Sequence, residues 1–156
     1  MIGSDAELLR PLPVFEHFGD EMLKLIAFSA IRESFPAGKV IFNEGDPATT
    51  GMLVVEGSVL MTETIDGEEV ERAIYGPGSL IGELALLTPT YRPATAIARA
   101  DARFLVIARE LMHRVLAEYP DVAIKLQGYL QHRLSNLNED LQASAIHVGM
   151  QGESLN

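Results

Sequence analysis

Residues 82–95 read GELALLTPTYRPAT and are the most informative stretch of the chain. A glycine opens a short apolar segment with one carboxylate, Glu83, and ten residues after that glycine comes an isolated Arg92. An arginine among apolar neighbours needs an anionic partner, because burying an unpaired charge is costly. That partner is either a protein carboxylate or a phosphate of a ligand.

Cations are scarce around this stretch. Between residues 36 and 108 the chain has five basic residues against ten acidic ones, and the whole chain carries a formal net charge of −10. A protein that binds nucleic acid gains most of its affinity from Lys and Arg side chains that neutralise phosphates. The charge balance therefore argues against DNA or RNA as a partner, while leaving room for a small site that holds one phosphate group.

Length and composition favour one globular domain. The chain has 156 residues, of which 47% are apolar, and both values are typical of a single globular domain. It has no cysteine, which excludes disulfides and thiolate metal sites. The start, MIGSDAELLR, lacks the features of a signal peptide, and no run approaches the roughly 18 apolar residues of a membrane span. We therefore expect a cytoplasmic protein.

The chain reads as a helix followed by strands. Residues 12–30 have apolar residues at helical spacing, with Asp20 as the expected N-cap. From about Phe35, glycines recur between short runs rich in β-forming residues, such as MLVVE and SVLMTETI. Asp66 and Gly67 stand between two of these runs, as in a hairpin with a type I′ turn. These signals predict a roll, sandwich or barrel of about eight strands.

Helical spacing returns from about residue 109. Pro120 is expected to end one helix and to open a second one. The second helix carries leucines spaced four, three and four residues apart, a seam of about two heptads, at Leu130, Leu134, Leu137 and Leu141. The seam fits packing on the chain's own β-domain and also pairing with another copy, and the two can both hold. Residues 143–156 show no period and are expected to form a disordered tail. The whole order indicates an α+β fold.

Catalytic and metal-binding motifs are lacking in the sequence. A β-barrel metalloenzyme needs clustered histidines, and the four histidines of this chain lie at 17, 113, 132 and 147, outside the β-rich region. The glycines at 76, 78 and 82 do not have the spacing or the βαβ context of a dinucleotide fingerprint. No G-x-S-x-G nucleophile elbow is present. We therefore expect a protein that is not an enzyme and that holds no metal or cofactor.

The residues of 82–95 suit a phosphorylated ribose. Gly82 allows close approach of the backbone to a ligand, and a short helix beginning there would aim N–H groups at an anion. Arg92 supplies a planar fork for two phosphate oxygens. The Glu83 carboxylate would repel a phosphate, so it fits better as an acceptor for a ribose hydroxyl. The alternative is a solvated ion pair between Glu83 and Arg92.

The stretch resembles the phosphate-binding cassette of the cyclic nucleotide-binding domain family. That family includes bacterial catabolite-activator regulators, regulatory subunits of cyclic-AMP-dependent kinase and cyclic-nucleotide-gated channels. Its pattern is roughly G-E-[LI]-A-L, a loop, then R-[AST]-A-T, and this chain gives GELALL, TPTY and RPAT. The resemblance covers about residues 10–142. It implies an eight-stranded antiparallel β-roll with an N-terminal helix and two C-terminal helices, over a domain of residues 1–142.

The resemblance also implies roles for single residues. Glu83 resembles the residue that holds the ribose 2′-hydroxyl, and Arg92 resembles the residue that pairs with the exocyclic oxygen of the cyclic phosphate. Asn138 and its neighbours at 136 and 137 lie where the C-terminal helix would approach the purine. The expected ligand-binding set is Gly82, Glu83, Leu84, Ala85, Arg92, Pro93, Ala94 and Asn138.

Pro93 departs from the family pattern, which has Ala, Ser or Thr after the arginine. In the family the backbone N–H at this position donates to the phosphate, and proline has no N–H. The lost donor costs about 1 kcal/mol of binding. Proline also lacks the hydroxyl that helps to hold cyclic GMP, so the position favours cyclic AMP over cyclic GMP. A degenerate domain that binds no nucleotide and serves protein interaction or dimerisation is the alternative.

The resemblance implies a regulatory function. A bound cyclic nucleotide would tighten the cassette and move the helix from about residue 120 to 141, which signals to a protein partner or drives self-association as a homodimer. Only 15 residues follow Leu141, whereas a DNA-binding domain needs about 50 or more. We therefore expect the output to pass through another protein or through a second copy of the chain.

Overall fold

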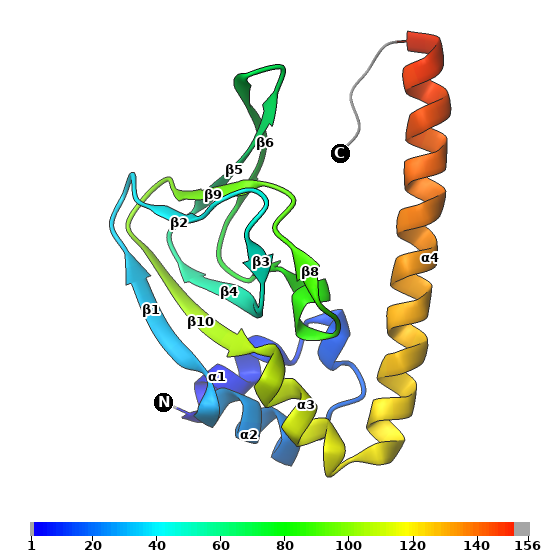
Figure 1. Ribbon diagram of the computed structural model, residues 1–156. Coiled ribbons are helices and arrows are strands. Elements are labelled where there is room, and N and C mark those ends of the chain that lie inside the picture. The colour runs from blue at the N-terminus through cyan, green and yellow to red at the C-terminus, as the bar shows by residue number, and fades with distance from the viewer. Residues whose placement is uncertain (1, 152–156) are drawn as a thin grey trace.

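The computed structural model describes the backbone of residues 2–151 and the side chains of residues 5–136. Helices stand at both ends of the chain and strands lie between them (Figure 1), which confirms the predicted α+β order. The helices are α1 (Ile2–Leu9), the 3-10 helix η1 (Pro13–Phe15), α2 (Asp20–Ser29), the 3-10 helix η2 (Glu83–Leu86), α3 (Arg109–Ala117) and α4 (Pro120–Gln151).

The strands form a roll of two four-stranded antiparallel sheets and one short pair. Their orders are β1-β10-β4-β7, β2-β9-β5-β6 and β3-β8. We expected about eight strands, and the described residues contain ten. The number is higher because loop segments also form short paired strands, such as the two-residue strands β3 and β8. The strands are β1 (Ile31–Phe35), β2 (Val40–Phe42), β3 (Pro47–Ala48), β4 (Thr50–Glu56), β5 (Val59–Ile65), β6 (Glu68–Tyr75), β7 (Leu80–Ile81), β8 (Thr90–Tyr91), β9 (Thr95–Ala98) and β10 (Ala102–Ala108).

The hairpin predicted at Asp66 and Gly67 is present. Ile65 of β5 pairs with Glu68 of β6 across this turn. Both turn residues have positive φ, 52° for Asp66 and 81° for Gly67, as a type I′ turn requires. This aspartate is the only residue other than glycine with positive φ in the described part of the chain.

The central strands β4 and β10 bury both of their faces. Successive side chains of a strand point to opposite faces. Leu53 and Leu105 face a core shared with the N-terminal and C-terminal helices, whereas Val54 and Phe104 face a second core inside the roll. The shared core therefore fixes the helices to the sheet that contains β4, β10 and β7. The cassette begins at Gly82, directly after β7 in the same sheet.

The beginning of α2 differs from the prediction. The N-cap is Gly19, and Asp20 is the first residue of the helix. The Asp20 carboxylate lies 2.7 Å from the Arg10 guanidinium instead, in the first turn where a negative charge favours the helix dipole. The expectation that Asp20 caps the helix was therefore wrong, although the helix begins within one residue of the expected place.

The last helix, α4, runs along one side of the roll (Figure 1). Pro120 lies in its first turn, as predicted, and the helix extends to Gln151, past the expected end near residue 141. The predicted disordered tail, 143–156, falls outside the residues with described side chains, and its last five residues fall outside the described backbone, so it stays a prediction. No helix in residues 2–151 combines the length and the apolar character that spanning a membrane requires.

Two adjacent faces of α4 differ in burial. The face toward the domain is partly or fully buried and has the spacing four, three, four and three, at Val122, Leu126, Tyr129, Arg133 and Asn136. The leucine seam runs one residue further along the helix, where Leu130 is half-buried and Leu134 is 42% exposed. In the described part of the seam, the chain's own domain thus covers Leu130 in part and leaves Leu134 exposed, while Leu137 and Leu141 lie outside the residues with described side chains.

Candidate functional site

The cassette begins with a left-handed glycine. Gly82 has φ 82° and ψ 39°, and the chain then forms η2, which is the short helix that the sequence predicted. A Cβ atom added to Gly82 would lie 2.5 Å from Arg92 Nη1 and 2.9 Å from the Thr50 carbonyl oxygen. The positive φ and the lack of room for a Cβ atom therefore both require glycine at this position. Without a side chain, the backbone of the cassette can lie directly against the Arg92 guanidinium.

The Arg92 side chain is buried among neutral partners. It follows β8 and is 7% exposed. Its Nη2 donates to the Thr50 carbonyl oxygen at 3.1 Å and to Thr50 Oγ1 at 3.0 Å, and its guanidinium carbon lies 4.2 Å from the centroid of the Phe42 ring. The backbone N–H of Arg92 donates to the Asp46 carbonyl oxygen. Thr50 of β4 and Phe42 of β2 thus hold the side chain, and the bond to Asp46 fixes the backbone from which it projects.

The charge of Arg92 has no close counter-ion in the described part of the protein. Among residues 5–136, no carboxylate lies within 4.0 Å of its guanidinium. Burial lowers the pKa of Arg92, and the more distant negative charge of Asp46 offsets this only in part. A buried cation with neutral partners costs free energy, so the site favours an anionic ligand.

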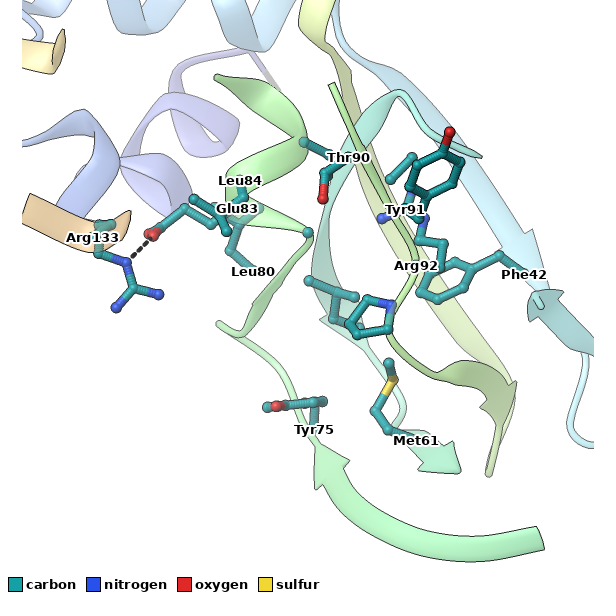
Figure 2. Close-up of a pocket in the computed structure, with 15 residues that line it drawn as sticks. Phe42, Met61, Tyr75, Leu80, Glu83, Leu84, Thr90, Tyr91, Arg92 and Arg133 are labelled. Atoms are coloured by element: carbon teal, nitrogen blue, oxygen red, sulfur yellow. Dashed lines mark hydrogen bonds and ion pairs between the residues drawn. The ribbon is translucent and has the colours of Figure 1, made fainter. Parts of the chain in front are cut away.

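The Glu83 carboxylate points to α4 instead of Arg92. Its Oε1 accepts a hydrogen bond from Arg133 Nε at 2.9 Å, and the Glu83 side chain is 17% exposed. Burial, with a smaller contribution from the nearby Glu83 carboxylate, raises the pKa of Tyr129 to about 12. Figure 2 shows Glu83 and Arg133 together on one side of the site and Arg92 on the other. The ion pair between Glu83 and Arg92, the alternative left by the sequence, is therefore not formed.

A cavity of about 390 Å³ lies between these two charged groups. Small-molecule sites commonly have volumes of roughly 300–1,000 Å³ and apolar walls with a few polar groups, and this cavity fits that description. Of the residues that the sequence assigned to the site, six line it: Gly82, Glu83, Leu84, Ala85, Arg92 and Pro93. Its further lining residues include Phe42, Met61, Tyr75, Leu80, Tyr91 and Arg133.

Of the other two residues assigned from the sequence, Ala94 does not line the cavity, and Asn138 is outside the residues whose side chains the structure describes. Ala94 directly precedes β9, is 5% exposed, and packs in the core inside the roll together with Ala96 and Ala98 of that strand. Asn138 lies in the part of α4 whose side chains fall outside the described residues. The neighbouring Asn136 is described, and its side-chain amide lies 3.2 Å from His132 Nε2.

Sequence reasoning missed Arg133 and the aromatic walls. Arg133 lies four residues after Tyr129 on the face of α4 that packs against the domain. A charged residue on an otherwise apolar helical face needs a partner, and this signal could have identified it. Phe42 and Tyr75 come from different strands and meet at the cavity through sheet topology, which leaves no local pattern in the sequence.

A metal site requires several ligating side chains close together. Among them there is no group of three or more His, Asp or Glu side chains that could hold a metal ion. The arrangement instead offers one buried guanidinium, one carboxylate and apolar walls, which suits binding of an organic anion.

Comparison with known proteins gives the family. The family model described as "Cyclic nucleotide-binding domain" matches residues 32–119, which include η2, Arg92 and most of the roll. The chain belongs to the cyclic nucleotide-binding domain family. The N-terminal helices and α4 extend this domain on both sides of the matched region.

Curated relatives of this cyclic nucleotide-binding domain include bacterial regulators. The cyclic AMP receptor protein of Thermus thermophilus is 34% identical over 130 residues, which cover 83% of this chain and 60% of the receptor. A CRP-like cAMP-activated global transcriptional regulator of Mycobacterium tuberculosis is 29% identical over 108 residues, 69% of this chain and 48% of the regulator. The chain thus spans about half to three fifths of these relatives.

Solved structures share the fold over most of the domain. The N-terminal domain of a transcriptional regulator from Streptomyces coelicolor is 33% identical, with a TM-score of 0.75 over 85% of this chain and 95% of that chain. The catabolite activator protein of Thermus thermophilus is 32% identical, with a TM-score of 0.69 over 86% of this chain and 63% of that chain. The β-roll with flanking helices is therefore the fold of this family.

Proposed function

We propose that this domain is a non-enzymatic regulatory module that binds a cyclic nucleotide in the cavity between η2 and α4, with cyclic AMP preferred over cyclic GMP. The observation that carries the proposal is Arg92, a buried cation beside the cavity with no close counter-ion among the described residues. The two Thr50 acceptors hold the guanidinium in place before any ligand arrives. A preorganised donor of this kind binds an anion with little further cost in ordering.

The other cavity residues fit the remaining parts of a nucleotide. Glu83 offers acceptor oxygens for a ribose hydroxyl, which donates. Met61 and Tyr75 lie on the opposite side of the cavity from η2 in Figure 2 and give a purine apolar contacts. A cytoplasmic location, where cyclic nucleotides are signals, belongs to the same proposal.

Thermal unfolding with added nucleotides tests this function. A ligand that binds only the folded state stabilises it, by about 2.7 kcal/mol at a free concentration one hundred times its dissociation constant. We expect cyclic AMP to raise the melting temperature, cyclic GMP to raise it less, and the open-chain 5′-AMP to raise it little. Equal effects of all three nucleotides, or no effect of any at millimolar concentration, would contradict the proposal.

The preference for cyclic AMP is expected to depend on Pro93. Pro93 lines the cavity and is exposed, so replacing it removes little packing. Pro93→Ala provides a backbone N–H for the phosphate and should tighten cyclic AMP binding about five- to tenfold, from about 1 kcal/mol of added hydrogen bonding. Pro93→Ser should improve cyclic GMP binding more than cyclic AMP binding. Calorimetric titration measures both affinities.

A matched control for these variants is Pro89→Ala, on the other side of β8. Pro89 is also exposed, and it is not among the cavity-lining residues. Its replacement should leave both affinities unchanged. If Pro93→Ala binds cyclic AMP no better than the wild-type protein does, the missing N–H is not what limits affinity.

The alternative function, a domain for protein interaction or dimerisation, is favoured by apolar side chains on the outer surface of α4. Ile124 is 67% exposed and Leu134 is 42% exposed. If a second copy covers this surface, Leu134→Glu should raise the dimer dissociation constant about tenfold or more, because burying an unpaired charge costs well over 1 kcal/mol. Sedimentation velocity measures this constant. Ser135→Glu, which adds the same charge at the next exposed position, is the control, and equal behaviour of the two variants would count against the seam.

A further inference from the structure

Thr90 places a hydroxyl in the cavity, two residues before the buried arginine. It is the first residue of β8, lines the cavity and is half-buried. Arg92 continues the pairing of that strand, because its backbone N–H donates to the Asp46 carbonyl oxygen. In Figure 2 the Thr90 hydroxyl points into the space between Glu83 and Arg92. Tyr91, which stands between the two residues in the chain, is 69% exposed, and its ring points away from that space.

The Thr90 hydroxyl has no hydrogen-bond partner among the side chains of residues 5–136. Two other threonines of the roll are paired. The Thr62 hydroxyl donates to Glu69 at 2.7 Å, and Thr50 Oγ1 accepts from Arg92 at 3.0 Å. A hydroxyl offers one donor and two acceptor positions, so the Thr90 side chain retains its full capacity to bind a ligand in the cavity.

The backbone that carries this hydroxyl is fixed by its neighbours. Thr90 pairs with Ala48 of β3. The Nη1 atom of Arg109, at the start of α3, donates to the Ala48 carbonyl oxygen at 3.0 Å. The same nitrogen lies 3.2 Å from the carbonyl oxygen of Thr88 and 3.3 Å from that of Ala85. One guanidinium thus joins β3, η2 and the loop before β8, so a contact through Thr90 costs little further ordering.

An anion beside Arg92 meets few other donors at this end of the cavity. The Nη2 atom of Arg92 is already engaged by Thr50, and Pro93 has no backbone N–H. Tyr75 also brings a hydroxyl to the lining, but it lies on the opposite side of the cavity from Thr90 in Figure 2. A phosphate that takes the remaining donors of Arg92 therefore still has acceptor positions for the Thr90 hydroxyl.

We propose that Thr90 is a further ligand-binding residue, whose hydroxyl donates to an exocyclic phosphate oxygen of the bound cyclic nucleotide while Arg92 pairs with the charge. This contact rests on the proposed function, because it belongs to the same site. The two side chains reach the phosphate from different directions, so each meets a different exocyclic oxygen. Thr90 thereby fixes the orientation of the phosphate, and its bond is strengthened by the charge of the acceptor.

Thr90→Val tests the contact, because valine keeps the shape and the strand preference of threonine and lacks the hydroxyl. Calorimetric titration should show cyclic AMP binding about tenfold weaker, and chemical denaturation of the ligand-free protein should show no loss of stability. Thr90→Ser, which retains the hydroxyl, should keep most of the affinity. Thr64→Val, at an exposed position of β5 outside the cavity lining, is the matched control and should bind as the wild-type protein does.

Analogues of cyclic AMP identify the atom that the hydroxyl meets. In the two phosphorothioate diastereomers, sulfur replaces one exocyclic oxygen or the other, and sulfur is a weak acceptor. The loss of affinity caused by Thr90→Val should nearly vanish for one diastereomer and persist for the other. It should also persist for 2′-deoxy cyclic AMP. An equal loss for both diastereomers, or no loss for the 2′-deoxy analogue, would overturn the phosphate contact.

Failure of the proposed function has a different outcome. If the wild-type protein binds neither cyclic AMP nor cyclic GMP, the proposed function falls and the role of Thr90 falls with it. If the wild-type protein binds cyclic AMP and Thr90→Val binds it equally well, the proposed function stands and only the contact of Thr90 is overturned. Weaker binding by Thr90→Val together with a lower free energy of unfolding would also overturn the contact, because the hydroxyl would then support the fold.

Discussion

Arg92→Met is expected to weaken cyclic AMP binding at least one hundredfold and at the same time to stabilise the ligand-free fold by about 1 kcal/mol. The loss of binding follows from the removal of charge-assisted hydrogen bonds, worth about 1.5–3 kcal/mol each. The gain in stability follows because the buried guanidinium has no close counter-ion among the described residues. A buried ion costs several kcal/mol even after relaxation, which exceeds the roughly 1 kcal/mol of a neutral hydrogen bond.

Methionine suits this position because it fills the same space without the charge. Its thioether can pack on the Phe42 ring, which the Arg92 guanidinium now covers. Chemical denaturation measures the free energy of unfolding, and calorimetry measures affinity. Arg103→Met is the matched control, because Arg103 is 61% exposed and pairs with Glu56 at the surface, so neither quantity should change much. A variant that unfolds more easily and still binds cyclic AMP would contradict both halves of the prediction.

Gly82→Ala is expected to destabilise the fold and to weaken nucleotide binding together. The positive φ of Gly82 strains any residue with a Cβ, at about 1–2 kcal/mol. The new Cβ would also meet Arg92 Nη1 at 2.5 Å and the Thr50 carbonyl oxygen at 2.9 Å. Displacing these buried groups should add about 1–3 kcal/mol. Because the guanidinium is pushed from its place, the affinity for cyclic AMP should fall by about tenfold or more.

Gly78→Ala separates backbone strain from the contact with Arg92. Gly78 has φ 91°, close to that of Gly82, and a Cβ added there would meet nothing within 4 Å. It also does not line the cavity. It should therefore lose about 1–2 kcal/mol of stability and retain wild-type affinity. If the two variants lose equal stability and both retain affinity, the cassette glycine does not position Arg92.

The fold and the centre of the site could be predicted because their signals are local. The turn at Asp66 and Gly67 needs two positive φ angles, which few residue pairs supply. The cassette needs a glycine at one fixed distance from an arginine, and the structure brings Gly82 and Arg92 into contact. Both requirements involve residues that are close in the sequence, so they can be recognised in a single amino-acid sequence.

The partners of the site could not be predicted because they depend on how distant elements meet. Thr50 lies at the beginning of β4 and Arg133 lies on α4, and both reach the cassette only in the folded protein. The direction of the Glu83 side chain is set by α4, so the sequence alone left open whether it pairs with Arg92. Ala94 was assigned to the site from its place in the motif, yet the chain places it in the core inside the roll just before β9 begins.

Calorimetric titration of the wild-type protein and of Arg92→Met with cyclic AMP tests the central claim most directly. The wild-type protein is predicted to give a saturable heat with one site per chain, and Arg92→Met is predicted to give none over the same concentrations. No saturable heat from the wild-type protein at millimolar cyclic AMP, or the same affinity in both proteins, would show that the cavity beside Arg92 is not a cyclic nucleotide site.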